Sequence, residues 1–246
     1  MKKSVIIAYY NGIKYINEQV GSILKQLDKG DELIISVDGW EDGSKELLFK
    51  LRENDSRIKI VAGPHQGVAK NFEQGLGYCN GDIIFIADQD DVWEDNKVEK
   101  VCEAFENPRV TAVVHNAMIV DENLEDSGTT TFQWRESKSG FWKNVKKNSY
   151  IGCCMAVKRG VLKSVLPIPE YIWIHDQWIG LLCEQLGKVI FLDDILLKYR
   201  RHGNNVTGLN HGHAVAMLKK RIFMIFGINQ RVKEWKKEDA ENQTVL

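Results

Sequence analysis

A cluster of carboxylates after a predicted strand constrains this chain more than any other feature. Residues 82–93 read DIIFIADQDDVW, and the apolar run Ile83–Ala87 has the length and β-branched content of a buried strand. Three carboxylates follow this run, Asp88, Asp90 and Asp91. Crowded carboxylates repel one another unless a cation lies among them, and hard oxygen ligands suit Mg²⁺ or Mn²⁺. Because open α/β sheets bind ligands beyond the carboxyl ends of their strands, the cluster predicts a metal–diphosphate site.

Length and composition are those of an ordinary globular protein. The 246 residues suffice for one large or two small domains, and a net charge of -1 gives no general attraction for nucleic acid or membrane. The odd number and the spacing of the cysteines predict neither a disulfide framework nor a zinc site. These residues are Cys79, Cys102, Cys153, Cys154 and Cys183. No run approaches the roughly 20 apolar residues of a membrane span, and the apolar run at the N-terminus is too short for a signal peptide, so we expect a cytoplasmic protein.

Strands alternate with helices in the first part of the chain. Strands are predicted over residues 4–9, 33–37, 58–62 and 83–87. Helices are predicted between them, over residues 14–27, 44–52 and 67–76. This alternation predicts an α/β fold with right-handed βαβ units, a mostly parallel sheet and helices on both of its faces.

The pattern is less regular after the carboxylates. Further helices are predicted over residues 95–106 and 176–186, and further strands over 111–120, 151–157 and 189–197. Residues 121–150 are polar and irregular, which in a compact domain usually marks a functional or disordered segment. No domain boundary is evident. We expect one domain over residues 1–212, to which an amphipathic helix and tail over 213–246 also belong.

Four motifs in order give the chain a recognisable resemblance. They are SVIIAYYNG at residues 4–12, SVDGWEDGS at 36–44, GVAKN at 67–71 and ADQDDVW at 87–93. Together they resemble the inverting glycosyltransferases of family 2, which have the GT-A fold. The later motifs HDQW (175–178) and YRRHGNN (199–205, ending in Asn204 and Asn205) resemble a rhamnosyltransferase-like branch that acts on bacterial surface polysaccharides. The resemblance implies transfer of a sugar from dTDP-rhamnose or a UDP-hexose to a saccharide acceptor.

The resemblance implies a nucleotide site after the first two strands. Ala8, Tyr9 and Tyr10 stand where the family wraps the base, although the family usually has Pro and Thr in place of Ala8 and Tyr9. Asp38 is the retained acid that contacts the base, and Trp40 replaces a small residue and could stack on the nucleotide or shield it. Two alternatives remain open from the residues themselves. Tyr9 could be a core aromatic at a strand end, and Asp38 a turn carboxylate.

The resemblance also assigns the carboxylates and two later basic residues. Asp88 is expected to contact the ribose and in some relatives the metal, whereas Asp90 coordinates the Mn²⁺ or Mg²⁺ ion. Asp91 would orient the donor sugar or cap the following helix, which Asp95 could also do. The list of expected metal ligands is completed by His202, and Arg201 is expected to contact the donor. His202 could equally be an ordinary loop residue.

Lys70 follows the glycine that opens the helix over 67–76. A helix N-terminus offers free N–H groups and a positive dipole end, and Lys70 adds a point charge suited to a diphosphate. The alternative is a solvated lysine at a helix start.

Asp176 is the residue expected to act as the general base. An inverting transfer needs one carboxylate to take the proton of the acceptor hydroxyl as its oxygen attacks. The resemblance places His175 and Trp178 beside the donor or acceptor. In isolation, an Asp at the start of an apolar helix is more often an N-cap. The thiols of Cys153 and Cys154, near the expected acceptor cleft, are interpreted as packing residues.

The segment 213–237 combines apolar residues with seven Lys or Arg. A basic amphipathic helix can lie on an anionic membrane, here the inner face of the plasma membrane, and the acceptor of such enzymes is often lipid-linked. The helix could instead pack on its own domain or on the twin subunit of a homodimer.

Two other functions remain open at this point. A nucleotidyltransferase also binds Mg²⁺ through carboxylates in an α/β sheet, but it would carry a basic, Gly-rich loop after the first strand, where residues 9–12 are neither. A catalytically silent nucleotide- or carbohydrate-binding protein could retain the fold, although Asp88, Asp90 and Asp176 argue against it.

Overall fold

The computed structural model describes residues 1–203 and 214–244, which fold around one mixed sheet. The strand order is β3-β2-β1-β4-β8-β6-β9-β5, and β7 pairs with β6. The strands are β1 (Lys3–Tyr10), β2 (Glu32–Gly39), β3 (Ile58–Ala62), β4 (Ile83–Ala87), β5 (Val92–Trp93), β6 (Val110–Val120), β7 (Asp126–Thr130), β8 (Met155–Lys158) and β9 (Lys188–Arg200). The α/β fold predicted from the sequence is therefore confirmed.

Strands β3, β2, β1 and β4 are parallel neighbours, as the alternation of strands and helices predicts. The apolar runs of β1, β2 and β4 are buried on both faces, with all five residues of β4 buried, whereas the edge strand β3 is partly exposed. All four strands run in the same direction, so the residues that follow β1, β2 and β4 meet at one edge of the sheet. This edge carries the residues predicted to bind the nucleotide and the metal.

The second half of the sheet is mixed. β8 runs antiparallel to β4 and β6, and β9 runs parallel to β6. The short β5, which follows the carboxylates, pairs antiparallel with Leu197–Lys198 in β9. This pairing holds the segment after β4 against the end of β9, although the two lie about 100 residues apart in the sequence.

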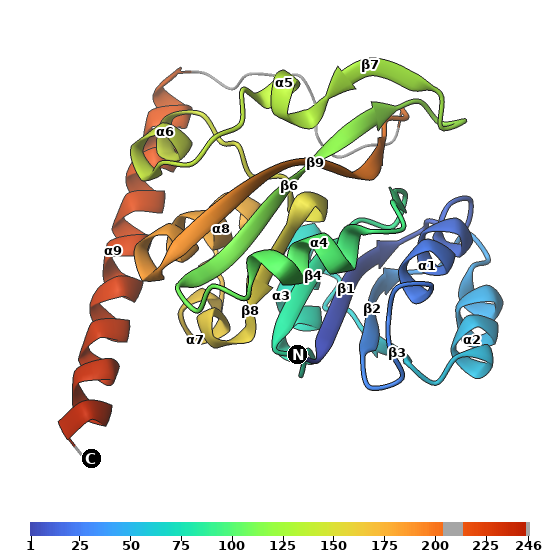
Figure 1. Cartoon of the computed structure of the whole chain (residues 1–246), viewed down its shortest axis with the longest axis horizontal. Coiled ribbons are helices and arrows are strands. Elements are labelled where there is room, and N and C mark those ends of the chain that lie inside the picture. Colours follow the sequence, from blue (N-terminus) through green and yellow to red (C-terminus); the bar gives the residue numbers. More distant parts are fainter. Residues whose placement is uncertain (204–213, 245–246) are drawn as a thin grey trace.

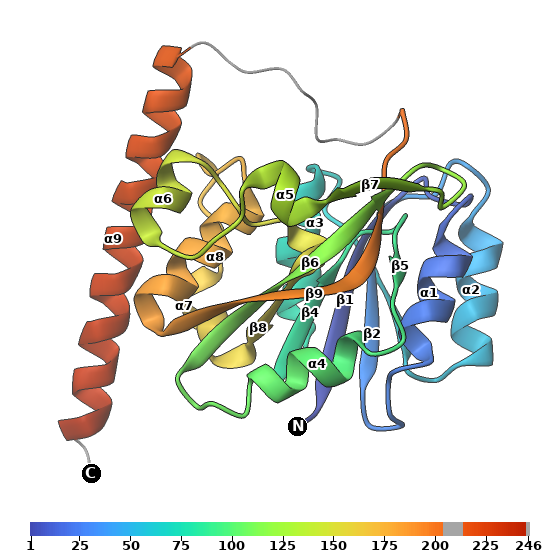
Figure 2. The ribbon, with the colours of Figure 1, turned by 45° about the horizontal axis from the view of Figure 1, so that its top comes forward.

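Helices cover both faces of the sheet (Figures 1 and 2). Alternate residues of β1 point to opposite faces, so Val5 and Ile7 join one apolar cluster while Ile6 joins the other. The first cluster packs under α1 (Ile16–Leu24), α2 (Lys45–Asn54) and α4 (Lys97–Ala104). The second packs under α3 (Val68–Gly77), α7 (Leu162–Val165), α8 (His175–Leu186) and α9 (Ala214–Thr244).

The segment expected to be irregular, 121–150, holds three short elements. They are β7, α5 (Thr131–Arg135) and α6 (Phe141–Lys146). A capping box between Thr130 and Gln133 starts α5, a local signal that sequence analysis overlooked. The strand expected over 151–157 begins later, at Met155, because Gly152–Cys154 forms a 3-10 turn, η1. A second 3-10 turn, η2 (Arg159–Val161), leads into α7.

The helix expected over 213–237 is longer than predicted and packs on the domain. In Figure 2, α9 runs along one end of the molecule with α6, α7 and α8 on its inner side. Met224 and Ile228 are buried in the second cluster, so packing on the domain is confirmed for this face of α9. Asn204, Asn205 and residue 213 lie outside the described residues. Among the helices described, none combines the length and apolar character needed to cross a bilayer.

Candidate active site

The carboxylates after β4 form a buried cluster with a cysteine. One oxygen each of Asp88 and Asp91 and the Sγ atom of Cys153 lie within 4.8 Å of one another. Asp91 accepts a hydrogen bond from the Arg200 backbone N–H at 3.0 Å through Oδ1, and its Oδ2 atom is buried without a partner. Burial and the neighbouring charge of Asp90 raise the pKa of Asp88 to about 7 and that of Asp91 well above its usual range.

Asp90 points to a different partner. Its Oδ2 atom lies 2.7 Å from Nε2 of His202, and the imidazole ring stacks on Tyr15 with 4.9 Å between ring centroids. The structure therefore brings together two of the three residues predicted as metal ligands, Asp90 and His202. It groups Asp88 with Asp91 and Cys153, however, rather than with Asp90 and His202 in a single set.

These donors fit a hard divalent cation. The unpartnered Asp91 oxygen and the raised carboxyl pKa values are features that a bound dication would relieve. Burial also raises the pKa of the Cys153 thiol well above its usual range, so this side chain is a neutral thiol and not a thiolate ligand. Carboxylate oxygens with one imidazole suit Mg²⁺ or Mn²⁺ rather than a soft metal.

Arg200 fixes the turn that carries Asp90 and Asp91. Its guanidinium donates to the carbonyl of Asp90 at 2.7 Å, to the carbonyl of Glu122 at 2.6 Å and to Glu18 Oε2 at 2.5 Å. The side chain is 4% exposed, so these bonds are shielded from water. From the sequence, Arg200 and Arg201 are late basic residues that could close over the diphosphate. The signal of Arg200, a basic residue at the end of a strand, gave no indication of a partner about 110 residues earlier.

Asp176 lies in the first turn of α8, close to the carboxylate cluster. A Cβ atom added to Gly152 would lie 3.4 Å from Nε2 of His175 and 4.0 Å from Cβ of Asp176. The next residue is Cys153, so η1 connects Asp176 with the cluster at the end of β4. Burial raises the pKa of Asp176 and lowers that of His175, which is therefore neutral at physiological pH.

Asp176 is not the N-cap of α8. The N-cap position is Ile174, and Oδ1 of Asp176 accepts hydrogen bonds from the Gln177 backbone N–H at 2.6 Å and from Asn148 Nδ2 at 3.4 Å. The capping alternative is likewise wrong for Asp91 and Asp95, because α4 begins after Asn96 and no side chain caps it.

The ends of β1 and β2 form the second part of the site. Oδ1 of Asp38 accepts a hydrogen bond from the His65 backbone N–H at 2.8 Å. Tyr10 is 61% exposed, and Gln89 bonds its backbone N–H at 2.8 Å and its carbonyl at 2.9 Å. A cavity of about 320 Å³ opens beside Asp38, and Trp40 forms part of its wall with residues of α2 and β3.

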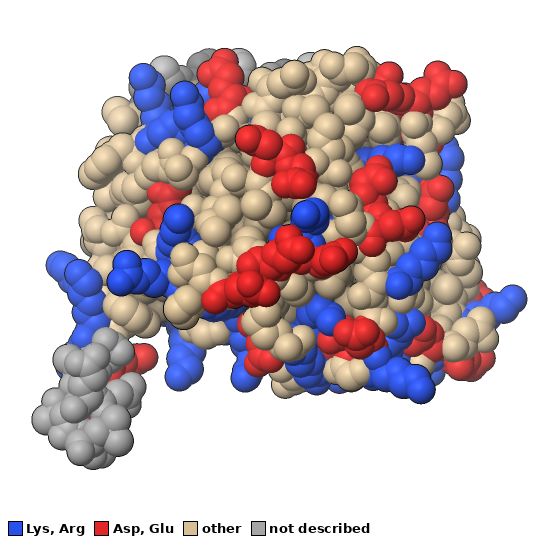
Figure 3. Space-filling view, viewed as in Figure 1, with Lys and Arg blue, Asp and Glu red and all other residues tan. Residues whose placement is uncertain are grey.

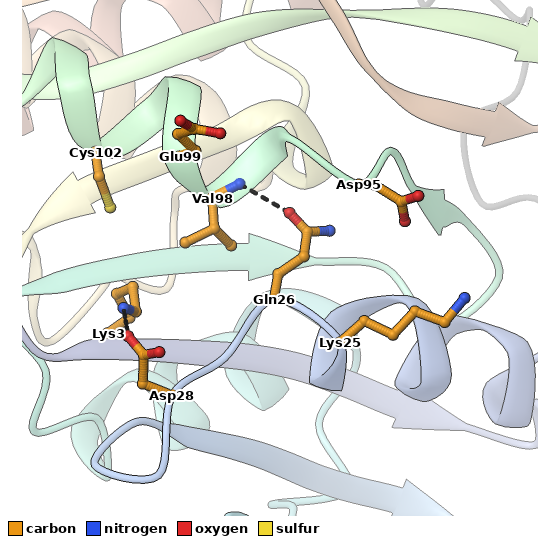
Figure 4. A pocket seen from close by; sticks show the side chains of 8 residues that line it. All are labelled: Lys3, Lys25, Gln26, Asp28, Asp95, Val98, Glu99 and Cys102. Carbon is orange, nitrogen blue, oxygen red and sulfur yellow. Dashed lines mark hydrogen bonds and ion pairs between the residues drawn. The ribbon is translucent and has the colours of Figure 1, made fainter.

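A second cavity, of about 300 Å³, lies at the opposite end of the strands (Figure 4). Its lining includes Lys3 at the start of β1, together with Asp28 and Asp95. None of the residues predicted for the functional site lines this cavity.

Comparison with known proteins identifies the family. The model of the family described as "Glycosyl transferase family 2" matches residues 4–166. The chain belongs to glycosyl transferase family 2. It is 30% identical over 213 residues to an uncharacterized glycosyltransferase of Nostoc sp., covering 83% of this chain and 66% of the relative.

Two further proteins extend the comparison. The UDP-Glc:alpha-D-GlcNAc-diphosphoundecaprenol beta-1,3-glucosyltransferase WfgD of Escherichia coli is 26% identical over 210 residues, covering 83% of this chain and 79% of WfgD. The crystal structure of S. aureus TarS 1-349 in complex with UDP-GlcNAc superposes with a TM-score of 0.72 at 17% identity, covering 92% of this chain and 66% of TarS 1-349. The fold expected from the family resemblance, GT-A, and the enzyme class, glycosyltransferase, are thus confirmed.

Two residues expected to contact ligands in this glycosyltransferase are core residues instead. Trp178 has no exposed surface, lies in the second apolar cluster and donates through Nε1 to the Val165 carbonyl at 3.0 Å, so its assignment to the donor or acceptor is wrong. Tyr9 is equally buried, in the first cluster, and its hydroxyl accepts from the Gly12 backbone N–H at 2.9 Å. The core alternative therefore describes the Tyr9 ring, while Ala8 and Tyr10 are the partly or largely exposed residues around it.

Lys70 and Arg201 have protein partners of their own. Lys70 Nζ pairs with Glu73 at 2.9 Å and donates to the Ile168 carbonyl at 3.0 Å, so it is not the free solvated lysine of the alternative. Contact between Lys70 and a diphosphate stays a prediction, and it requires Lys70 to give up its bonds to Glu73 and to the Ile168 carbonyl. Arg201 lies over the ring of Trp134, 5.2 Å from the centroid. Cys153 and Cys154 are buried, as their interpretation as packing residues predicts.

Lys97 is a buried positive charge that sequence analysis missed. Its side chain has no exposed surface, its Nζ donates to the Cys153 carbonyl at 3.0 Å, and it lies 4.0 Å from the centroid of the Trp93 ring. Burial lowers its pKa to about 8. Because Lys97 donates this hydrogen bond to the backbone of η1, it helps to place Cys153 against the carboxylates.

Replacing Tyr9 with phenylalanine tests the core interpretation. The change removes the acceptor of the Gly12 N–H, so we expect the free energy of unfolding to fall by about 1–3 kcal/mol. Donor affinity should stay within about twofold, because the ring faces the core. Denaturant unfolding and calorimetric titration of the nucleotide measure the two effects. A large loss of nucleotide affinity in a stable variant would show that Tyr9 contacts the base.

Proposed function

We propose that this protein is a metal-dependent inverting glycosyltransferase that transfers a sugar from dTDP-rhamnose or a UDP-hexose to a saccharide acceptor of a bacterial surface polysaccharide. One observation carries the proposal. Asp176, a half-buried carboxylate with a raised pKa, lies across η1 from the carboxylates that follow β4. A base and a diphosphate-binding cluster are thus neighbours, as a single displacement at an anomeric carbon requires.

In the proposed reaction Asp176 takes the proton of the acceptor hydroxyl. Oδ1 is held by the Gln177 N–H and by Asn148, which fixes the carboxylate in one orientation. The raised pKa makes Asp176 a stronger base than a solvated carboxylate once it is ionised. His175, the preceding residue, is stacked on Phe72 with 4.6 Å between ring centroids.

The donor would lie between the ends of β1, β2 and β4. Asp38 and Trp40 are proposed to contact the base, and Asp88 the ribose. Asp90, Asp88 and His202 are proposed to hold the Mn²⁺ or Mg²⁺ ion, with the orphaned oxygen of Asp91 directed at the same region. Bound there, the ion would neutralise the nucleoside diphosphate as it leaves.

A lipid-linked saccharide is the proposed acceptor class. The support is the activity of WfgD, a glucosyltransferase that acts on a diphosphoundecaprenol-linked GlcNAc and aligns with 83% of this chain. A homodimer remains a further proposal for the assembled protein.

The experiment is a panel of nucleotide sugars with Mn²⁺ or with EDTA. A ligand that binds only the folded state raises the melting temperature, so the true donor should stabilise the protein only with metal. Incubation with acceptor should then release a nucleoside diphosphate. Pyrophosphate as the product would indicate a nucleotidyltransferase, and binding without turnover would indicate a silent binding protein. Either outcome contradicts the proposal.

A further inference from the structure

The two long faces of α9 have different surroundings. On the inner face, Met224 and Ile228 are buried, and Gly227 lies so close to α8 that an added Cβ would be 3.0 Å from the Trp178 ring. The outer face carries Leu218, Ile222 and Phe226, which are 57%, 58% and 62% exposed. Their spacing of four residues aligns them on one side of the helix. Core packing thus explains the inner face and leaves the outer face unexplained.

Exposed tryptophans flank this helix on both sides. Trp142 in α6 is 70% exposed, and α6 is tied to α9 by the hydrogen bond that Arg221 donates to the carbonyl of Lys146, the last residue of α6, at 2.6 Å. Trp173, before α8, is 53% exposed, and Lys220 Nζ lies 5.1 Å from the centroid of its ring. Exposed Trp beside Lys and Arg is typical of the boundary between water and lipid. We use the name α6–α9 surface for this region. It comprises Trp142, Trp173, Leu218, Ile222 and Phe226, with Lys219 and Lys220 between them.

The part of α9 that carries this surface is basic. Residues 217–226 contain Lys219, Lys220 and Arg221 and no acid, whereas α9 as a whole contains seven Lys or Arg and four acids. Lys146 and Lys147 in and after α6 add to the positive charge of the surface. Figure 3 shows Lys and Arg gathered over α6 and a band of acidic side chains over α4. α4 and α9 pack on different apolar clusters of the sheet, and the basic side chains over α6 and the acidic band over α4 are both visible in the view of Figure 3.

We propose that the α6–α9 surface docks on the anionic headgroups of a phospholipid bilayer. Leu218, Ile222 and Phe226 would enter the headgroup–acyl boundary, and the lysines would contact phosphates. A second copy of the chain fits this surface less well, because a twofold contact would bring two basic patches together.

This docking places the proposed acceptor side of the enzyme next to the lipid. Asn148, just after α6, donates to Asp176, and Gln177 donates to the Asn144 carbonyl of α6 at 2.7 Å. The proposed base and the docking surface therefore share one rigid unit. This advantage rests on the proposed function, but the binding itself is testable without turnover.

The test is co-sedimentation of the full chain with vesicles of phosphatidylglycerol and phosphatidylcholine. We expect binding to mixed vesicles that falls with added salt, and little binding to phosphatidylcholine alone. The double variant Ile222→Glu, Phe226→Glu should bind mixed vesicles at least about tenfold more weakly than the wild type. Both side chains are exposed, so the circular dichroism and melting temperature should stay as in the wild type.

The matched control is Tyr78→Glu, which places a carboxylate at an exposed aromatic at the end of α3, where Tyr78 is 49% exposed. It should bind vesicles like the wild type, and soluble-acceptor turnover should not change in either variant. Equal vesicle binding by the wild type and the double variant would overturn the proposal. So would light scattering that shows a wild-type dimer and a monomeric double variant, because the surface would then join two copies.

Discussion

The substitution Asp176→Asn is expected to lower turnover about 10²-fold or more, the scale typical of losing a general base. Asparagine has almost the same shape, and its Oδ1 can still accept from the Gln177 N–H and from Asn148. Only the ability to take a proton is lost. Release of nucleoside diphosphate, measured with saturating donor and acceptor, gives the effect.

The pH dependence separates a base from a positioning residue. Burial holds the pKa of Asp176 above the usual 3.8, so the charged form that accepts the proton is lost as pH falls through this raised value. Wild-type kcat/KM should therefore decline on the acid side at a higher pH than a solvated carboxylate would give. The residual activity of Asp176→Asn should lack this limb.

Stability should move in the opposite direction to activity. A carboxyl whose pKa is raised in the folded state costs stability as pH rises from its unfolded value through the folded one. Asp176→Asn removes this cost, so at neutral pH the variant should be at least as stable as the wild type. The matched control is Asp126→Asn, an exposed acid that also accepts a backbone N–H, from Gly128 at 2.6 Å. Asp126→Asn should change neither the free energy of unfolding nor the turnover. A near wild-type rate for Asp176→Asn would show that the base lies elsewhere.

The sequence predicts the nucleotide-binding half of the fold better than the rest because its signals there are local. β3 and β4 have the predicted bounds, since short apolar runs between turn residues are typical of buried parallel strands. The pairing of β5 with β9 and the antiparallel β8 arise from contacts between distant segments, which no local pattern specifies. The short helices α5 and α6 fell in a polar segment without a long amphipathic period.

The same distinction holds within the site. The carboxylates after β4 are evident from the sequence because position at a strand end fixes their place. Whether a side chain faces the ligand or the core is decided by packing. Tyr9 and Trp178 both occur in motifs, yet alternation along β1 and the contact with α9 turn them inward. Arg200 and Lys97 act on the cluster through bonds to backbone carbonyls, which leave no pattern in the sequence.

The substitution Asp90→Ala is expected to abolish metal-dependent donor binding and to leave the fold intact. Asp90 is proposed as the main ligand, and its carboxylate is one of the negative charges that raise the pKa of Asp88 and Asp91. Its removal leaves the Arg200 bond to the Asp90 carbonyl in place, so the turn should persist. In the wild type, metal with donor at about 100 times the dissociation constant should add about 2.7 kcal/mol to the free energy of unfolding. This gain should vanish in Asp90→Ala.

The control is Asp95→Ala. Asp95 is an exposed acid five residues later, and it lines the cavity at the opposite edge of the sheet, so this variant should keep the gain in the free energy of unfolding. If nucleotide affinity is the same in Asp90→Ala and the wild type, with and without EDTA, then Asp90 does not hold the metal. Asp88 and Asp91, which lie within 4.8 Å of each other, would be the ligands to replace next.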